Sequence, residues 1–208
     1  MNPNWAEENL QTIRTLMERS ALYRRALAPI MLFAGIMGVL AAVVGIFLKL
    51  DSSFQFGGLW LGTALVVVIG ALLIARRQAL KDGEGFWSPP TRRVAQALAP
   101  PLTAGLVLGL IDLWLWDRHP VIVPFIWALF YGCALHSAGF FMRRGVRLFG
   151  WIYIGLVPLI NIVNIAILAK SLDEVCPPPH WIMGFFFGVL HLAYGAYLFF
   201  TEKGKNAA

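Results

Sequence analysis

The sequence predicts an all-α, polytopic membrane protein: a bundle of six transmembrane helices preceded by a short cytoplasmic amphipathic helix. Three observations lead to this prediction. Hydrophobic residues make up 59% of the 208 residues and charged residues only 13%, whereas soluble domains are about half apolar and about a quarter charged. Six apolar runs have the length, or nearly the length, that a bilayer crossing needs. Basic residues are concentrated in alternate connections between these runs.

A helix needs about 20 apolar residues to cross the hydrocarbon core of a bilayer. The six runs that meet or approach this length are 26–50, 59–75, 94–116, 121–142, 148–169 and 181–200. The second run is the shortest and the third contains Pro100 and Pro101, but the charge pattern requires both. A closed β-barrel is excluded because its strands would alternate apolar and polar residues, and runs such as 64–75 do not.

The positions of the basic residues predict the orientation. Of the 17 Lys and Arg residues, all but Lys49, Arg118 and Lys170 fall in the N-terminal segment, the second and fourth connections or the C-terminal tail. The positive-inside rule places those segments, and hence both termini, in the cytoplasm. Trp60, Trp114, Trp116 and Trp181 then fall at the outer boundary, where an aromatic belt is expected. Basic residues that flank apolar runs indicate contact with the lipid bilayer, and we predict no nucleic-acid partner.

This topology divides the chain into a cytoplasmic helix (1–25), a transmembrane domain (26–200) and a cytoplasmic tail (201–208). In the first segment, apolar residues recur at helical spacing and Arg14 and Arg19 lie off that stripe. Such a helix lies on the inner leaflet, packs against the cytoplasmic ends of the bundle or docks a cytoplasmic protein. Phe86 and Trp87, in the longest internal loop, have the same two alternatives.

Few polar residues fall inside the apolar runs, and these are the candidates for function because polar groups are costly in hydrocarbon. They are Asp112, Asn161, Asn164 and His191. Asp112 is expected near the outer interface, as a hydrated carboxylate or as a cation-binding group. Asn161 and Asn164 share one face of the fifth run, where they either line a cavity or form hydrogen bonds between helices.

His136 and His191 carry the one cofactor hypothesis. Two neutral imidazoles on facing helices could hold a haem or a metal ion. The alternative is that each imidazole forms a hydrogen bond with a neighbouring helix. The sequence has no HxxxH or HExxH pair on one helix, so we predict no cofactor and keep haem as the alternative.

Two patterns concern packing. The short match between the segments that begin at Gly132 and Gly188 aligns His136 with His191, and it suggests three tandem hairpins. The pairs Gly105/Gly109 and Gly184/Gly188 are GxxxG motifs, which permit close contact between helices. We expect these glycines to support packing within the bundle before they support a homo-oligomer.

Both ends of the chain carry a resemblance. The segment IRTLMERS at 13–20, and the run 183–195 with its Met-Gly, His191 and Tyr-Gly, resemble an uncharacterised family of small six-helix bacterial inner-membrane proteins. Their motifs read IRxxMERS and, approximately, MGxxFGxxHxxYG. The resemblance implies a multi-pass protein of the bacterial inner membrane and supplies no mechanism.

No reaction motif is present: the chain lacks a phosphate-binding GxxxxGK[ST] loop, a GxSxG elbow and an HExxH pair. We therefore predict a non-enzymatic membrane protein, either a small transporter or channel-like protein or a component that docks a partner. A transporter predicts a cavity near the midplane faced by some of the four polar candidates. A redox protein with haem held by His136 and His191 is the rival from a different class.

Overall fold

The structure is a computed structural model that describes residues 26–83, 85–115, 120–142, 144–168 and 178–205. For 164–168 and 202–205 it describes the backbone alone. The predicted amphipathic helix of residues 1–25, including Arg14 and Arg19, therefore lies outside the described residues. Within the described ranges the fold is all-helical, as predicted, and contains no β-strand.

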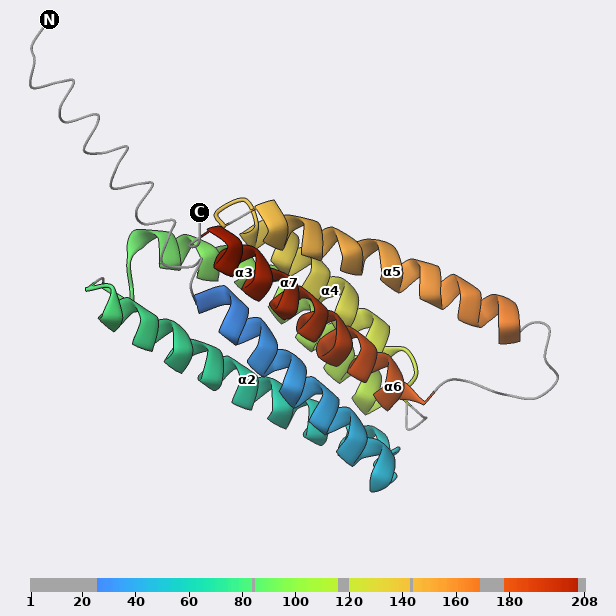
Figure 1. Ribbon diagram of the computed structural model, residues 1–208. Helices are drawn as coiled ribbons and strands as arrows, with labels where there is room; N and C mark the ends of the chain where they lie inside the picture. The colour runs from blue at the N-terminus through green and yellow to red at the C-terminus, as the bar shows by residue number, and fades with distance from the viewer. Residues whose placement is uncertain (1–25, 84, 116–119, 143, 169–177, 206–208) are drawn as a thin grey trace, which may run out of the picture.

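The helices follow one another in alternating directions along a common axis (Figure 1). The first helix is Ala26–Phe47. It is followed by α2 (Ser53–Lys81), α3 (Pro89–Leu115), α4 (Val123–Ala138), α5 (Arg144–Leu168), α6 (Pro179–Met183), the π-helical segment η1 (Gly184–Val189) and α7 (Leu190–Lys205). The last three segments continue into one another, and we call them together the last helix.

Five of these helices are long and apolar enough to cross a membrane: the first helix, α2, α3, α5 and the last helix. This confirms a helical membrane protein. The sixth, α4, has 16 residues. At about 1.5 Å per residue it extends roughly 24 Å, somewhat less than the ~30 Å hydrocarbon core. It packs against α3 on one side and α5 on the other, in the interior of the bundle.

The helix boundaries differ from the apolar runs because helices begin at caps and not at the edge of the hydrocarbon. The predicted second run begins at 59, but α2 begins at Ser53, where Ser52 accepts a hydrogen bond from the backbone N–H of Gln55 at 3.4 Å. This is the serine half of an S-x-x-Q capping box. The α3 helix begins at Pro89, directly after Ser88, with proline at its first position. The last helix extends to Lys205, past the expected end of its apolar run.

Glycines bring the last helix against the first helix. A methyl group added at Gly188 would lie 3.0 Å from the backbone nitrogen of Val39, and one added at Gly38 would overlap the carbonyl of Phe187. The pair Gly105/Gly109 brings α3 against α4 in the same way, because an added carbon at Gly105 would lie 2.6 Å from Cβ of Phe130. The GxxxG motifs thus support close internal packing, as the sequence predicted.

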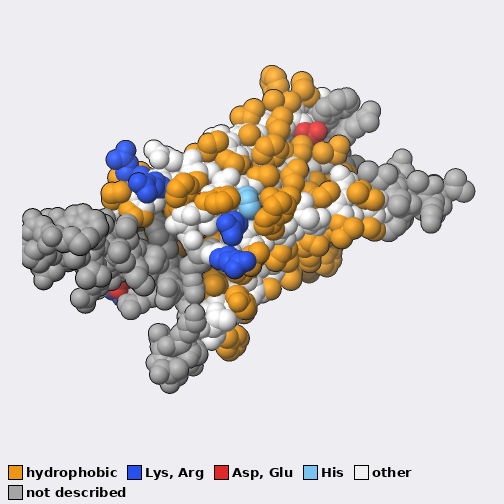
Figure 2. Space-filling model, turned by 90° about the horizontal axis from the view of Figure 1, so that it is seen from above, with side chains coloured by type: hydrophobic (Ala, Val, Ile, Leu, Met, Phe, Trp, Pro, Cys, Tyr) orange, Lys and Arg blue, Asp and Glu red, His pale blue; other side chains and the backbone are white. Residues whose placement is uncertain are grey.

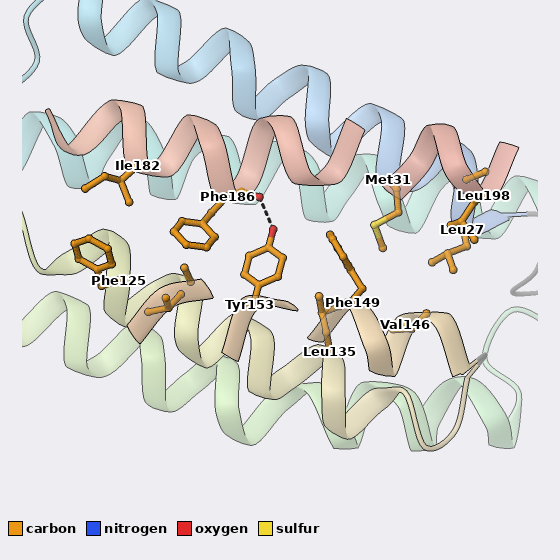
Figure 3. Close-up of a cluster of buried hydrophobic side chains, with 13 residues drawn as sticks. Leu27, Met31, Phe125, Leu135, Val146, Phe149, Tyr153, Ile182, Phe186 and Leu198 are labelled. Atoms are coloured by element: carbon orange, nitrogen blue, oxygen red, sulfur yellow. Dashed lines mark hydrogen bonds between the residues drawn. The ribbon is translucent and has the colours of Figure 1, made fainter. Parts of the chain in front are cut away.

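The main core lies between the last helix and the pair α4 and α5 (Figure 3). Figure 3 shows Phe149 and Tyr153 of α5 directed toward Phe186 and Met31, with Leu135 of α4 beside them. Much of the remaining surface is apolar: Phe54 is 91% and Phe47 84% exposed. Such side chains need lipid around them, which is consistent with a membrane protein.

Charged side chains are separated along the bundle axis. Figure 2 shows a face that is mostly hydrophobic, with Lys and Arg side chains gathered toward one end. One end of the bundle is formed by the C-terminal end of α2 and the N-terminal ends of α3 and α5. It carries the basic residues Arg76, Arg77, Lys81, Arg92, Arg93, Arg144 and Arg147. The opposite end carries Lys49, Asp51 and Asp112 among the described residues. The alternation seen in the sequence is therefore a charge difference between the two ends of the fold.

Candidate functional site

Two cavities lie between the helices of the bundle, each of them partly open to the outside, and they share part of their walls. One has a volume of about 260 Å³ and lies between the first helix, α2, α3, α4 and the last helix. The other, of about 360 Å³, lies between the same helices and reaches the start of α5. Six of the lining residues are common to both cavities and form what we call their junction: Ala34, Val67, Val68, Leu102, Tyr131 and His191. No charged side chain is among the described residues that line either cavity.

Tyr131 and His191 are the polar residues at this junction, and they are joined by a hydrogen bond. The Tyr131 hydroxyl lies 2.7 Å from Nε2 of His191. On the other side of the imidazole, Nδ1 lies 3.2 Å from the Tyr153 hydroxyl and 3.2 Å from the carbonyl oxygen of Phe186. The Tyr153 hydroxyl also donates to that carbonyl, as the dashed line in Figure 3 shows. The four groups form one buried chain of hydrogen bonds that joins α4, α5 and the last helix.

The π-helical turn makes the Phe186 carbonyl available to this chain. In an α-helix that carbonyl would accept from the backbone N–H of Leu190, four residues on. In the structure the N–H of Leu190 donates to Phe185, five residues back. The Phe186 carbonyl is therefore open to the two side-chain donors, Tyr153 and His191. π-Turns of this kind occur often at functional sites.

No family model, no curated protein and no solved structure matches this sequence. The cavity and its hydrogen-bond chain are thus the basis for assigning a function.

Asp112 and Asn161 are not among the described residues that line the cavities. Asp112 is half-buried on α3, near the C-terminal end of that helix. Asn161 is exposed on α5, and the side chain of Asn164 lies outside what the structure describes. Of the four intramembrane candidates, the described structure places only His191 at a cavity.

The two interfacial aromatic candidates lie at the basic end of the bundle. Phe86 and Trp87 line the end of the larger cavity, and Trp87 is 61% exposed. Their rings pack against one another with centroids 6.4 Å apart. Trp114, Trp151 and Trp181 are also exposed, which is consistent with aromatic belts at the two interfaces.

His136 and His191 belong to separate ring clusters. The His136 ring packs edge-on against Trp151 and Phe140, with centroids 5.0 and 5.3 Å apart, and its Nδ1 is buried without a hydrogen-bond partner. Both ring nitrogens of His191 take part in hydrogen bonds instead. A haem iron bound at His191 would have to displace one of these bonds. The geometry therefore offers no observation in favour of the two-histidine haem hypothesis.

A second buried polar cluster, formed by His180, Trp60 and the carbonyl of Leu50, was not predicted from the sequence. His180, which is fully buried, accepts a hydrogen bond at Nδ1 from the indole N–H of Trp60 at 3.1 Å. Its Nε2 donates to the carbonyl of Leu50 at 3.0 Å. Trp60 is 3% exposed, so the prediction that it belongs to the outer aromatic belt was wrong. These hydrogen bonds connect α2 and α6 to the turn after the first helix. Neither Trp60 nor His180 lies at the junction of the cavities.

Proposed function

We propose that this is a non-enzymatic integral membrane protein that binds an apolar molecule drawn from the bilayer, as a small carrier or transporter does. The observation that carries the proposal is the pair of uncharged cavities that meet at Tyr131 and His191. Small-molecule sites occupy ~300–1,000 Å³; the smaller cavity, of about 260 Å³, lies just below this range and the larger, of about 360 Å³, just inside it. The walls are largely apolar, with the polar side chains of Tyr131 and His191 at the junction. Such walls suit a molecule that already dissolves in the membrane.

The proposed setting is the inner membrane of a bacterium, with six crossings and both termini in the cytoplasm. The resemblance of the chain ends supports the bacterial membrane, and the basic end of the bundle supports the orientation. The short α4 serves as the sixth crossing, because its neighbours α3 and α5 supply the apolar surface around it. A contact of the N-terminal helix with a cytoplasmic protein, or of one bundle with a second copy, remains compatible with this arrangement.

Labelling of single cysteines tests the orientation. In a chain with Cys133 and Cys176 replaced by alanine, Ser88→Cys lies at the basic end and Asp51→Cys at the opposite end. A membrane-impermeant maleimide added to intact cells is expected to label Asp51→Cys alone, and to label Ser88→Cys only after lysis. The reverse pattern would overturn the proposed orientation.

Photolabelling tests the binding function. A diazirine-bearing long-chain hydrocarbon, added to vesicles that contain the protein, is expected to label the cavity walls to saturation. Val68 is 54% exposed but lines both cavities, so Val68→Trp adds an indole to the wall of their junction and this labelling should be reduced. Val66→Trp is the matched control, because Val66 is on the same helix, 46% exposed and not part of either cavity. Labelling that never saturates, or that Val68→Trp does not reduce, would show lipid contact at the surface alone and refute the function.

A further inference from the structure

The larger cavity runs from the junction to the basic end of the bundle. Its walls include Phe86, Trp87 and Thr91 at that end, and Leu102 at the junction. Thr91 and Leu102 are 11 residues apart on α3, which corresponds to about 16 Å of helix. The hydrocarbon core of a bilayer is ~30 Å thick, so this length matches about one leaflet. A chain that lies in the larger cavity therefore has one end at the basic surface of the membrane and the other near its middle.

The larger cavity opens toward lipid between α2 and α3. Its exposed lining residues are Val68 and Leu72 of α2, Trp87 of the connection and Leu102 of α3. The lining residues that come from the first helix, α4, α5 and the last helix are buried or half-buried. A lipid of the surrounding bilayer can thus reach the cavity sideways, without first crossing water.

Arginines flank this cavity where α2 ends and α3 begins. Arg76 lies four residues after Leu72, which lines the cavity, and Arg92 lies three residues before Ala95, which also lines it. Each arginine therefore shares a helix face with a lining residue, and both are exposed. Among the side chains that the structure describes at this end, the acidic one is Asp82, whose carboxylate accepts a hydrogen bond from a side chain of α2 at 3.0 Å. The mouth of an apolar cavity is thus positively charged.

We propose that the larger cavity holds one hydrocarbon chain of an anionic lipid, whose phosphate headgroup is bound by Arg76 and Arg92. This proposal rests on the proposed function and names its ligand class. Guanidinium groups match phosphate oxygens in a bidentate way, and basic pockets between membrane helices bind anionic headgroups. The positive-inside rule explains why basic residues gather at one end, but it does not require two of them to flank an apolar cavity. A cationic headgroup would meet a like charge there.

Two amphiphiles with the same chain test the proposal. Oleyl phosphate has an anionic headgroup and oleyltrimethylammonium has a cationic one. Each competes with the diazirine-bearing hydrocarbon for labelling of the cavity walls, in full-length protein reconstituted in phosphatidylcholine vesicles. Oleyl phosphate is expected to displace the label from the wild-type protein at the lower concentration. In the double variant Arg76→Gln, Arg92→Gln, the concentration of oleyl phosphate needed for half displacement should rise by roughly tenfold to thirtyfold.

The double variant Arg77→Gln, Arg93→Gln is the matched control. It removes the same charge from the same two helix ends, but neither residue lies three or four positions from a lining residue of its helix. This variant should respond to oleyl phosphate as the wild-type protein does.

Equal competition by the two amphiphiles in the wild-type protein, or an equal effect of the two double variants, would overturn the proposal. The binding function would still stand in that case, because labelling by the hydrocarbon would remain saturable. Labelling that does not saturate in the wild-type protein would refute the function and the proposal together.

Discussion

Replacing Tyr153 with phenylalanine removes one buried hydroxyl and keeps the rest of the core. The ring contacts of Tyr153 with Phe149 and Phe186 persist in the variant, because they need no oxygen. The Phe186 carbonyl keeps one donor, Nδ1 of His191 at 3.2 Å. The variant therefore loses a hydrogen bond without leaving a bare carbonyl.

The expected cost follows from this difference. A net intramolecular hydrogen bond contributes about 0.5–1.5 kcal/mol to the free energy of unfolding, and hydrogen bonds between membrane helices average ~0.6 kcal/mol with a maximum of ~1.7. We expect Tyr153→Phe to cost about 1 kcal/mol. The double variant Tyr153→Phe, His191→Phe removes both donors, so it should cost more than the sum of the two single changes, by about 1 kcal/mol or more.

Unfolding in detergent by titration with SDS, followed by tryptophan fluorescence, measures these free energies. Tyr197→Phe changes an exposed hydroxyl and should leave the midpoint unchanged. A loss of 3 kcal/mol or more in Tyr153→Phe alone would exceed the ~0.5–1.5 kcal/mol of one hydrogen bond and contradict the idea that the carbonyl has a second donor. No loss at all, or strictly additive costs, would contradict the shared acceptor.

Three further predictions concern packing, the Trp60–His180 cluster and haem. Gly188→Leu should destabilise the bundle by about 1–3 kcal/mol in the same assay, because its side chain would meet the backbone of the first helix; Gly58→Leu has open space and should cost little. Trp60→Phe leaves the buried His180 without its donor and should cost about 1–3 kcal/mol; a neutral result would exclude that hydrogen bond. Because both nitrogens of His191 are engaged, the purified protein should show no Soret band before or after dithionite; a band lost in His191→Ala would establish the haem alternative.

Hydropathy and charge predicted the helices well because both act over a whole span. Each of the six apolar runs contains the centre of a helix, and alternate connections lie at one basic end. The boundaries needed local chemistry as well. The start of α2 could have been predicted from Ser52 and Gln55, which have capping-box spacing. The early end of α4 at Ala138 could not have been predicted in this way. It lies where α4 comes close to α5: a methyl group added at Gly139 would lie 2.6 Å from Cα of Arg147, a contact that local sequence spacing does not show.

The site was only half predictable. His191 stood out because a histidine within an apolar run needs a partner, and the structure gives it two, Tyr131 and Tyr153. His180 did not stand out, because it follows three prolines and was placed outside the sixth run. Its donor Trp60 is 120 residues away, and no local spacing connects them. The tandem-hairpin hypothesis stays a prediction: its two aligned histidines have different surroundings, with His191 buried and His136 half-buried.

The π-turn gives the last helix two rotational phases. One extra residue in a turn shifts everything after it by roughly 100° about the axis, since an α-helix has 3.6 residues per turn. Residues before Gly184 and after Val189 therefore follow separate helical periods, although they occupy one continuous span. Deleting a single residue from this turn would preserve the length and apolarity that membrane insertion requires, yet it would rotate His191 and the glycine contacts of one half relative to the other. Insertion into the membrane and assembly of the cavity are thus separable properties of the same span.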